Sequence, residues 1–358
     1  MLKSRRGLLA AGLSAAVVGA IGVVSTLNAG AEQIPDAPAP AVAPADVAPA
    51  DTAEAAAPAE SVAKPPTNLP WGERPRKVRT GRFGATSKSL KAAGLSAAHS
   101  EDRGRDRAPK GRTNRTESLR TQTTTVVPPE PVPTESPDAA ARPTVHFLYN
   151  VGSQSAEADA AYANLTISKP KLAKSDYHTL AEIAVQSADG KQIVEVGWTV
   201  DRVVNGDDDP HLFVYHWVDR QTSCYNGCGF VQYSKTIKPG DTLVQDTQKK
   251  FGIQNFNGDW WVAYDTEWVG YFPGELWGGK FTRSGLVQIF GEVAATTATP
   301  CTEMGNGKGG ADTTAAKVGS VSYLNGPPVE MKVRSTSDYY SVEKLSARTF
   351  RYGGSGAC

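Results

Sequence analysis

The chain has 358 residues, 40% of them hydrophobic, and a formal net charge of +1, a length that could hold two or three domains. Residues 67–125 carry fourteen Lys and Arg against five Asp and Glu, whereas residues 143–358 carry nineteen against twenty-three. Most aromatic residues and all four Cys also lie beyond Pro143. The foldable part is therefore mildly acidic, which argues against nucleic-acid binding.

The first 31 residues have the pattern of an export signal. Lys3, Arg5 and Arg6 precede an apolar run that ends in small residues at Ala29-Gly30-Ala31. The arginine pair also fits a twin-arginine signal, which serves proteins exported in the folded state. We expect cleavage after Ala31 and no stable membrane insertion afterwards; the alternative is a retained anchor. The predicted location is extracellular, either free or associated with the cell wall.

Residues 32–142 form a predicted disordered leader. The first part is rich in Ala and Pro, the middle is basic, and the end is again rich in Pro. Such a composition buries too little apolar surface to offset the entropy of ordering. A solvated linker, a propeptide and a spacer to the cell wall all remain open for this segment.

Beyond residue 143 the chain alternates short β-rich segments with turn residues. Turns are indicated by Asp189-Gly190, Asn205-Gly206, Pro239-Gly240 and Asn257-Gly258. Only residues 273–281 suggest a helical turn. The predicted strands are 144–151, 163–168, 177–187, 192–201, 211–217, 230–233, 249–256, 260–264, 267–272, 286–294, 316–324 and 329–336. We therefore predict one all-β domain over residues 143–358, an antiparallel sandwich or open barrel.

The four Cys allow three disulfide pairings. The short Tyr225-Asn226-Gly227 loop favours Cys224–Cys228, which leaves Cys301–Cys358 to hold the C-terminus. An exported protein makes disulfides the expected state. The alternative is a metal site at Cys224-x-x-x-Cys228, which lacks a nearby pair of His.

The common catalytic motifs are absent from the sequence. We find no Ser/His/Asp elbow, no His-Glu-x-x-His helix and no phosphate-binding glycine loop. The five His residues stand alone, and each is expected to be a surface or packed ring. We predict neither a metal nor a cofactor.

Two Glu residues stand out because each lies inside a predicted apolar strand. Alternation places Glu195 with Ile193, Gly197 and Thr199, opposite the face of Val194, Val196, Trp198 and Val200. Glu292 shares its face with Leu286, Gln288, Phe290 and Ala294. Each Glu either faces water or lies in a groove. Two that meet in a groove would titrate as a pair, one activating a water as base and the other donating a proton.

Six blocks of the sequence resemble the neprosin family of secreted glutamic peptidases, in that family's order. They cover residues from about 144 to 324 and consist of Glu195–Trp198, His211–Trp217, Cys224–Gln232, Gly258–Val262, Val269–Leu276 and Phe290–Val293. The pair Phe290-Gly291 departs from plant members, which show a Trp or a Gly-rich pair there. The leader also bears no clear likeness to the plant activation peptide.

The resemblance implies a curved antiparallel β-sandwich whose cleft holds two catalytic Glu, with plant members cutting after proline in acid. Carried over by motif, the pair falls on Glu195 and Glu292. The disulfides of the family likewise resemble Cys224–Cys228 and Cys301–Cys358.

Further side chains are candidates for lining such a cleft. Tyr215, Trp217, Phe272 and Trp277 could stack on a prolyl ring, with a place in the core as the alternative for each. Gln288 shares the face of Glu292. Gln232 could bind a developing oxyanion, although bonding to backbone groups is the more common role of a Gln at a strand end.

The predicted function is a secreted glutamic endopeptidase that uses Glu195, Glu292 and a bound water on a peptide or protein substrate. We expect cleavage near proline and a monomer. The alternative is a catalytically silent β-sandwich that binds a glycan or peptide at the cell surface.

Overall fold

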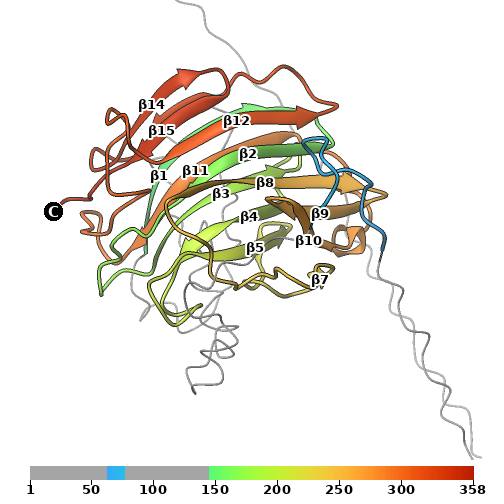
Figure 1. Cartoon of the computed structure of the whole chain (residues 1–358), viewed down its shortest axis with the longest axis horizontal. Helices are drawn as coiled ribbons and strands as arrows, with labels where there is room; N and C mark the ends of the chain where they lie inside the picture. The colour runs from blue at the N-terminus through green and yellow to red at the C-terminus, as the bar shows by residue number, and fades with distance from the viewer. Residues whose placement is uncertain (1–62, 77–144) are drawn as a thin grey trace, which may run out of the picture. The chain divides into compact units, whose positions relative to one another are not determined.

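The computed structural model describes residues 63–76 and 145–358, which lie in one compact unit of the chain. Two antiparallel sheets make up this part (Figure 1). Sheet A contains, in spatial order, β13 (Lys332–Ser335), β1 (His146–Ser155), β11 (Leu286–Ala295), β3 (His178–Gln186), β4 (Ile193–Val200), β5 (His211–Val218) and β6 (Gln221–Thr222). Sheet B contains β14 (Ser341–Ser346), β15 (Thr349–Gly353), β12 (Lys317–Leu324), β2 (Ala160–Ile167), β8 (Thr247–Phe256), β9 (Asp259–Tyr264), β10 (Glu267–Phe272) and β7 (Val231–Gln232).

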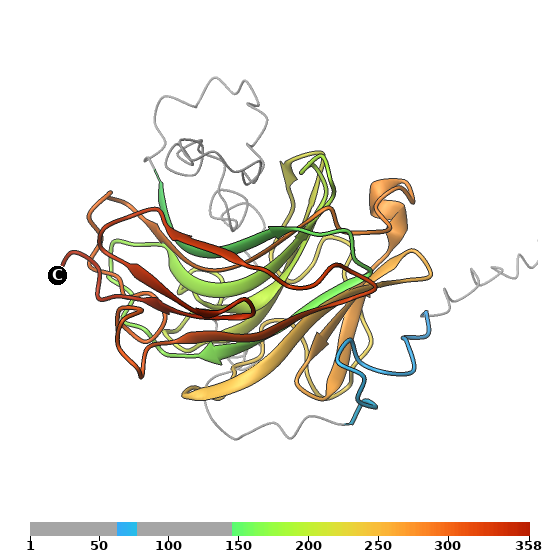
Figure 2. The same cartoon turned by 90° about the horizontal axis from the view of Figure 1, so that it is seen from above.

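The two sheets pack face to face around one hydrophobic core, and Figure 2 shows that their strands are strongly curved. Val194, Val196, Trp198 and Val200 of β4 all belong to this core, as strand alternation predicts. Sheet B contributes side chains such as Phe251, Trp260 and Phe272. The all-β sandwich is thus confirmed. The face of each sheet that points away from this core is called its outer face.

Every predicted strand has a counterpart, with bounds that differ by a few residues. The predicted helical turn is confirmed as the short 3-10 helix η3 (Gly274–Trp277). The sequence analysis missed β6, β14 and β15. The hairpin of β14 and β15 turns at Ala347-Arg348, because Ser346 pairs with Thr349. Neither residue is a usual turn former, and most of β14 is exposed, so pattern and turn chemistry both gave too little signal.

Both predicted disulfides are present, Cys224–Cys228 and Cys301–Cys358. The described residues contain no free cysteine and no cluster of His, Cys, Asp or Glu able to hold a metal ion. Within the same two ranges no helix is long and apolar enough to cross a membrane.

Residues 63–76 pack on the outer face of sheet B, although the sequence analysis placed them in the leader. The predicted export signal, residues 1–31, and the rest of the leader lie outside the described residues. The proposed domain boundaries stay a prediction.

Candidate active site

Glu195 of β4 and Glu292 of β11 lie on the outer face of sheet A, and both are completely buried. Aromatic side chains surround them there, including Tyr149, Phe213, Tyr215, Trp217 and Phe290. Both carboxyl groups therefore lie in a largely apolar layer, where an ionised group needs a partner.

Strand β3 separates the two carboxylates. Glu195 is paired with Ala184 on β3, and Glu292 is paired with Leu180 of the same strand. In a flat sheet, two strands across and four residues along would place the two Cα atoms about 16 Å apart. In a twisted and curved sheet, the distance between the two carboxyl groups also depends on the curvature of the strands.

A third buried carboxylate, Glu182, occupies the middle of this diagonal. Its register partners are Gly197 on β4 and Phe290 on β11, each two residues from one of the predicted pair. Glu182 is completely buried. The site therefore contains a diagonal row of three acidic side chains, one from each of three adjacent strands.

Gly197 allows β3 and β4 to approach at this point. A Cβ atom at residue 197 would lie 2.1 Å from the carbonyl oxygen of Ala181 and 2.7 Å from Cα of Glu182. No side chain fits into that space. The Glu-x-Gly spacing of β4 thus places Glu195 two residues from a position where only Gly leaves room for the neighbouring strand.

Tyr225, in the Cys224–Cys228 loop, is buried on the same face of sheet A as the row of carboxylates. Its ring centroid lies 5.3 Å from that of Tyr215, which is the register partner of Glu195 on β5. Burial raises the pKa of Tyr225 well above its usual range, and the charges of Asp201, Glu292 and Glu182 raise it further. One ring thus contacts the neighbour of Glu195 and lies within electrostatic reach of the other carboxylates.

Glu292 is held by a buried histidine. Nε2 of His178 lies 2.8 Å from Oε1 of Glu292, and Nδ1 lies 3.7 Å from Oδ2 of Asp201. Burial lowers the pKa of His178, but hydrogen bonds and charges from Asp201 and Glu292 outweigh it and raise the pKa to about 9. His178 is accordingly a cation at neutral and acidic pH, and it places a positive charge directly against Glu292.

Tyr149 lies on the other side of Glu292, as its register partner on β1. Burial raises the pKa of the Tyr149 hydroxyl well above its usual range, and the negative charge of Glu292 raises it further. Tyr149 is thus a neutral hydrogen-bond donor next to this carboxylate.

Glu195 has a neutral donor as its neighbour. The indole Nε1 of Trp217 donates a hydrogen bond of 3.2 Å to Oε1 of Glu195. The rings of Trp217 and Tyr215 lie 5.5 Å apart. The two predicted catalytic residues therefore differ in surroundings, because Glu292 faces an imidazolium and Glu195 faces an indole N–H.

The remaining predicted cleft residues divide between the two sheets. Gln288 is buried beside the row and accepts a hydrogen bond of 2.5 Å from Nε2 of Gln186. Gln232 lies on β7 at the edge of sheet B, where its Nε2 donates to the carbonyl oxygens of Ser234 and Ile237. Gln232 thus bonds to backbone groups and does not join the carboxylates.

Phe272 and Trp277 belong to the core between the sheets. They pack around His216, with ring centroids 4.8 and 5.8 Å from its own, and burial lowers the pKa of His216 to about 4. Trp277 also donates a hydrogen bond of 2.8 Å to the carbonyl oxygen of Trp217. These aromatic residues contact β5 on the core side of sheet A, and the carboxylates lie on its outer face.

The sequence analysis missed Glu182, Asp201 and Tyr149 and assigned His178 no special role. The available signal was alternation within β3, which places His178, Leu180, Glu182, Ala184 and Gln186 on one face. Three polar side chains on one face of a buried strand, here His178, Glu182 and Gln186, are uncommon unless each has a partner.

The model of the family described as Neprosin matches residues 175–355, about half of the chain. The chain belongs to the neprosin family. The chain is accordingly a peptidase of that family. No curated protein matches the chain in sequence.

Several solved structures are similar to this chain at low identity. Scytalido-glutamic peptidase with a transition state analog inhibitor is 11% identical, with a TM-score of 0.35, over 59% of this chain and 100% of that chain. SCP-B, a member of the eqolisin family of peptidases in complex with the tripeptide Ala-Ile-His, is 11% identical, with a TM-score of 0.29 and the same coverage. The carbohydrate-binding module CBM66 from Bacillus subtilis is 9% identical, with a TM-score of 0.25, over 43% and 80%. Similarities at this level carry no information about what this chain binds or cuts.

Proposed function

We propose that the chain is a secreted glutamic endopeptidase in which Glu292 and Glu195 act on one water molecule. The single observation that supports the assignment of roles is the contact of 2.8 Å between His178 and Glu292. This contact orients the Glu292 carboxylate and places a cation beside the group that we assign as general base. Glu195, which accepts a hydrogen bond from an indole, is the proton donor in this proposal.

In the proposed reaction, Glu292 removes a proton from water as the water oxygen attacks the carbonyl carbon of the peptide bond. The carbonyl oxygen gains negative charge, and the buried donors of this face, such as the Tyr149 hydroxyl, are candidates to stabilise it. Glu195 then gives its proton to the peptide nitrogen as the C–N bond breaks. The products are a carboxylic acid and an amine, and a second proton exchange restores both Glu residues.

The proposal extends to cleavage specificity and to export. Cleavage near proline is inferred from the family resemblance and from the aromatic side chains next to Glu195, because aromatic faces stack well on prolyl rings. Export is inferred from the signal-like sequence of residues 1–31 and from the two disulfides, which persist in oxidising compartments. The monomeric state remains a prediction.

The test is hydrolysis of quenched fluorescent peptides with Pro or Ala before the scissile bond, between about pH 2 and pH 7, a window set by carboxyl pKa values. We expect Glu195→Gln and Glu292→Gln each to lower kcat by roughly 10²–10⁴-fold, since general acid–base catalysis contributes about this much. Glu275→Gln changes an exposed Glu outside the site and serves as the control. Equal rates for wild type and Glu195→Gln would defeat the proposal.

Glu182→Gln belongs in the same set of variants. If Glu182 acts only through its electrostatic effect on Glu195 and Glu292, Glu182→Gln shifts the pH profile of hydrolysis but keeps most of the kcat. If Glu182→Gln lowers kcat by roughly 10²–10⁴-fold while either Glu195→Gln or Glu292→Gln stays active, the catalytic pair is Glu182 and the remaining essential Glu.

A further inference from the structure

Three aromatic side chains gather on the outer face of sheet B, away from the carboxylates. Trp261 of β9 lies with its ring centroid 5.8 Å from Trp268 and 4.6 Å from Tyr271, both of β10. Residues three apart in a regular strand point to opposite faces, but the ladder between β9 and β10 is irregular between Trp268 and Gly270. This bulge brings Trp268 and Tyr271 to the same face and builds an aromatic surface.

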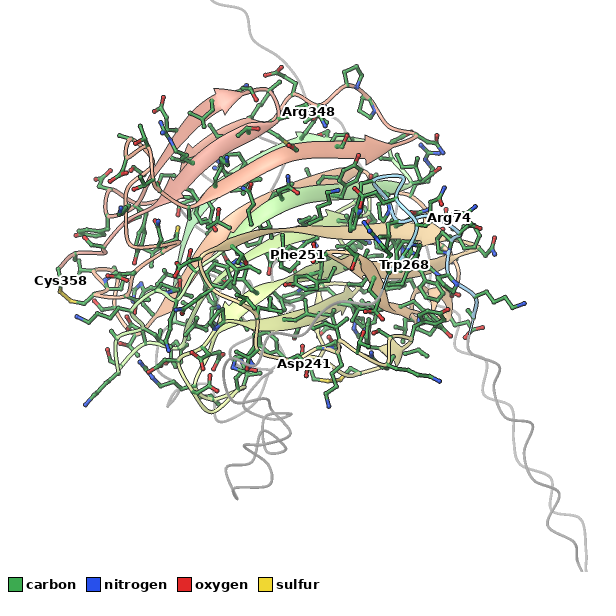
Figure 3. All side chains as sticks on the ribbon, in the orientation of Figure 1. Arg74, Asp241, Phe251, Trp268, Arg348 and Cys358 are labelled. Carbon is green, nitrogen blue, oxygen red and sulfur yellow. A yellow bond between two sulfur atoms is a disulfide. The ribbon has the colours of Figure 1, made fainter. Side chains whose placement is uncertain are left out.

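Residues 63–70 cover this surface. Leu69 is 2% exposed and packs in one cluster with Trp261, Trp268 and Tyr271. The indole Nε1 of Trp268 donates a buried hydrogen bond of 3.1 Å to the carbonyl oxygen of Pro66, and the backbone N–H of Ala63 donates one of 3.2 Å to the Tyr271 hydroxyl. Figure 3 shows Trp268 on the same side of the molecule as Arg74, near the other end of the segment.

The second half of the segment is held by sheet B as well. Trp71 packs edge-on against Tyr162, and Nζ of Lys250 lies 5.4 Å from the centre of its ring and 2.6 Å from Oε1 of Glu73. Gly252 of β8 leaves the necessary room, because a Cβ there would lie 3.1 Å from Trp71. The contact therefore extends across β10, β9, β8 and β2.

The chemistry of this contact is that of proline recognition. Pro65, Pro66 and Pro70 have fixed φ and lack an N–H, so the segment loses little entropy on binding and needs few backbone partners. Aromatic rings that pack on such a segment while an indole N–H bonds a carbonyl oxygen are a recurring mode of peptide binding. Every contact named above is non-covalent.

We propose that the outer face of sheet B is a binding site for a proline-rich peptide that turns at residues 69–72, occupied by residues 63–76 of the same chain. The occupant stays bound when the chain is cut between residues 76 and 145. This site is on the opposite sheet from the three carboxylates, so it holds whether or not the proposed hydrolysis does.

The first experiment uses the full chain with a recognition sequence for a site-specific protease inserted between residues 77 and 144. After the cut, gel filtration and mass spectrometry show whether the two pieces stay together. We expect one peak that contains both pieces in native buffer and two peaks in denaturant. Separation of the pieces in native buffer would overturn the proposal.

A matched pair of variants locates the contact. Leu69→Asp places a charge among the three aromatic rings and should speed release of the cut piece at least tenfold. Asn68→Asp introduces the same charge at the exposed neighbouring position and should leave release unchanged. Equal release from both variants, with the unfolding temperature of the larger piece unchanged, would contradict the assigned surface.

A synthetic peptide of residues 63–76 tests binding without the covalent connection. Added in excess to the cut protein under conditions where the piece slowly dissociates, it should replace that piece, whereas the same peptide with Leu69→Asp should not. Failure of the unmodified peptide to exchange would reject a peptide-binding site.

Discussion

His178 links the acidic residues of the site to the stability of the fold. Its pKa is about 9 in the folded chain against an ordinary value of 6.5, because Asp201 and Glu292 favour the cation. Above the ordinary value, the folded state therefore binds more protons than the unfolded state. The stabilisation is complete below about pH 6.5 and is lost as the pH rises through about 9, a change on the order of 3 kcal/mol.

We predict that the free energy of unfolding of the wild type falls between pH 6.5 and pH 9, and that His178→Gln lacks this fall. The Gln side chain keeps a hydrogen-bond donor but removes the charge. Chemical denaturation at several pH values measures the slope. His216→Gln is the control, because the pKa of His216 is about 4 and that residue does not titrate in this window. An identical slope in wild type and His178→Gln would show that His178 does not carry the charge.

Among the single residues of the site, the sequence identifies some members and misses others. Glu195 and Glu292 are recognisable because each interrupts an apolar alternating strand. Glu182 follows the same rule, yet its strand also carries His178 and Gln186 on that face, which reads as a solvated surface. Only the register with β4 and β11 shows that these polar groups are buried together.

The close approach of β3 and β4 depends on one missing side chain. A Cβ at residue 197 would meet both the backbone and the side chain of Glu182. We predict that Gly197→Ala forces the strands apart and costs about 2 kcal/mol of stability, or roughly 5 °C in Tm. Thermal unfolding measures the cost, and peptide hydrolysis shows the accompanying displacement of Glu182.

Gly319→Ala on β12 is the matched control. The nearest atom to a Cβ at residue 319 would be 3.6 Å away, an ordinary contact, so the same substitution should change Tm by no more than a degree or two. Equal losses at both positions would mean that general strand propensity, and not the contact with Glu182, sets the effect.

Strand position proved easier to predict than strand irregularity. Alternation and Gly-containing turns located β4, β5 and β11 almost to the residue. The bulge in β10 leaves no mark in the sequence, because Trp268 and Tyr271 are both typical strand residues. Its consequence, a second aromatic surface on sheet B, was therefore outside what periodicity could show.

The two disulfides close loops of very different length. Cys301–Cys358 spans 57 residues, including β12 to β15, whereas Cys224–Cys228 spans four. Loop-closure entropy gives about 4 kcal/mol for the long loop and about 2 kcal/mol for the short one. The short loop, however, carries Tyr225, whose ring packs on Tyr215, the register partner of Glu195.

We predict opposite rankings for the two paired Cys→Ser variants. Removing Cys301–Cys358 should lower the free energy of unfolding more, and removing Cys224–Cys228 should lower kcat more. Denaturant titration and peptide hydrolysis on the same preparations supply the two measurements. If one variant shows the larger loss in both, then the division between stability and catalysis is wrong.

For the whole molecule, composition correctly separated a β-rich part from the rest but could not show that residues 63–76 pack on sheet B. This segment is polar and proline-rich, like the leader around it. Its attachment depends on Leu69 meeting side chains about two hundred positions later in the chain, and on Trp71 meeting Tyr162 and Lys250, about 90 and 180 positions later. A composition window carries no information about contacts at that separation.

The two buried imidazoles, His178 and His216, make the stability of the fold depend on pH in opposite directions. His216 is kept neutral among Phe272 and Trp277, and its pKa is about 4. The free energy of unfolding therefore decreases as the pH falls from about 6.5 toward 4, because the unfolded chain takes up the proton first. His178 has the reverse effect on the alkaline side. The combined contribution of the two imidazoles to the free energy of unfolding is therefore largest near pH 6.5 and becomes smaller both in acid and in base.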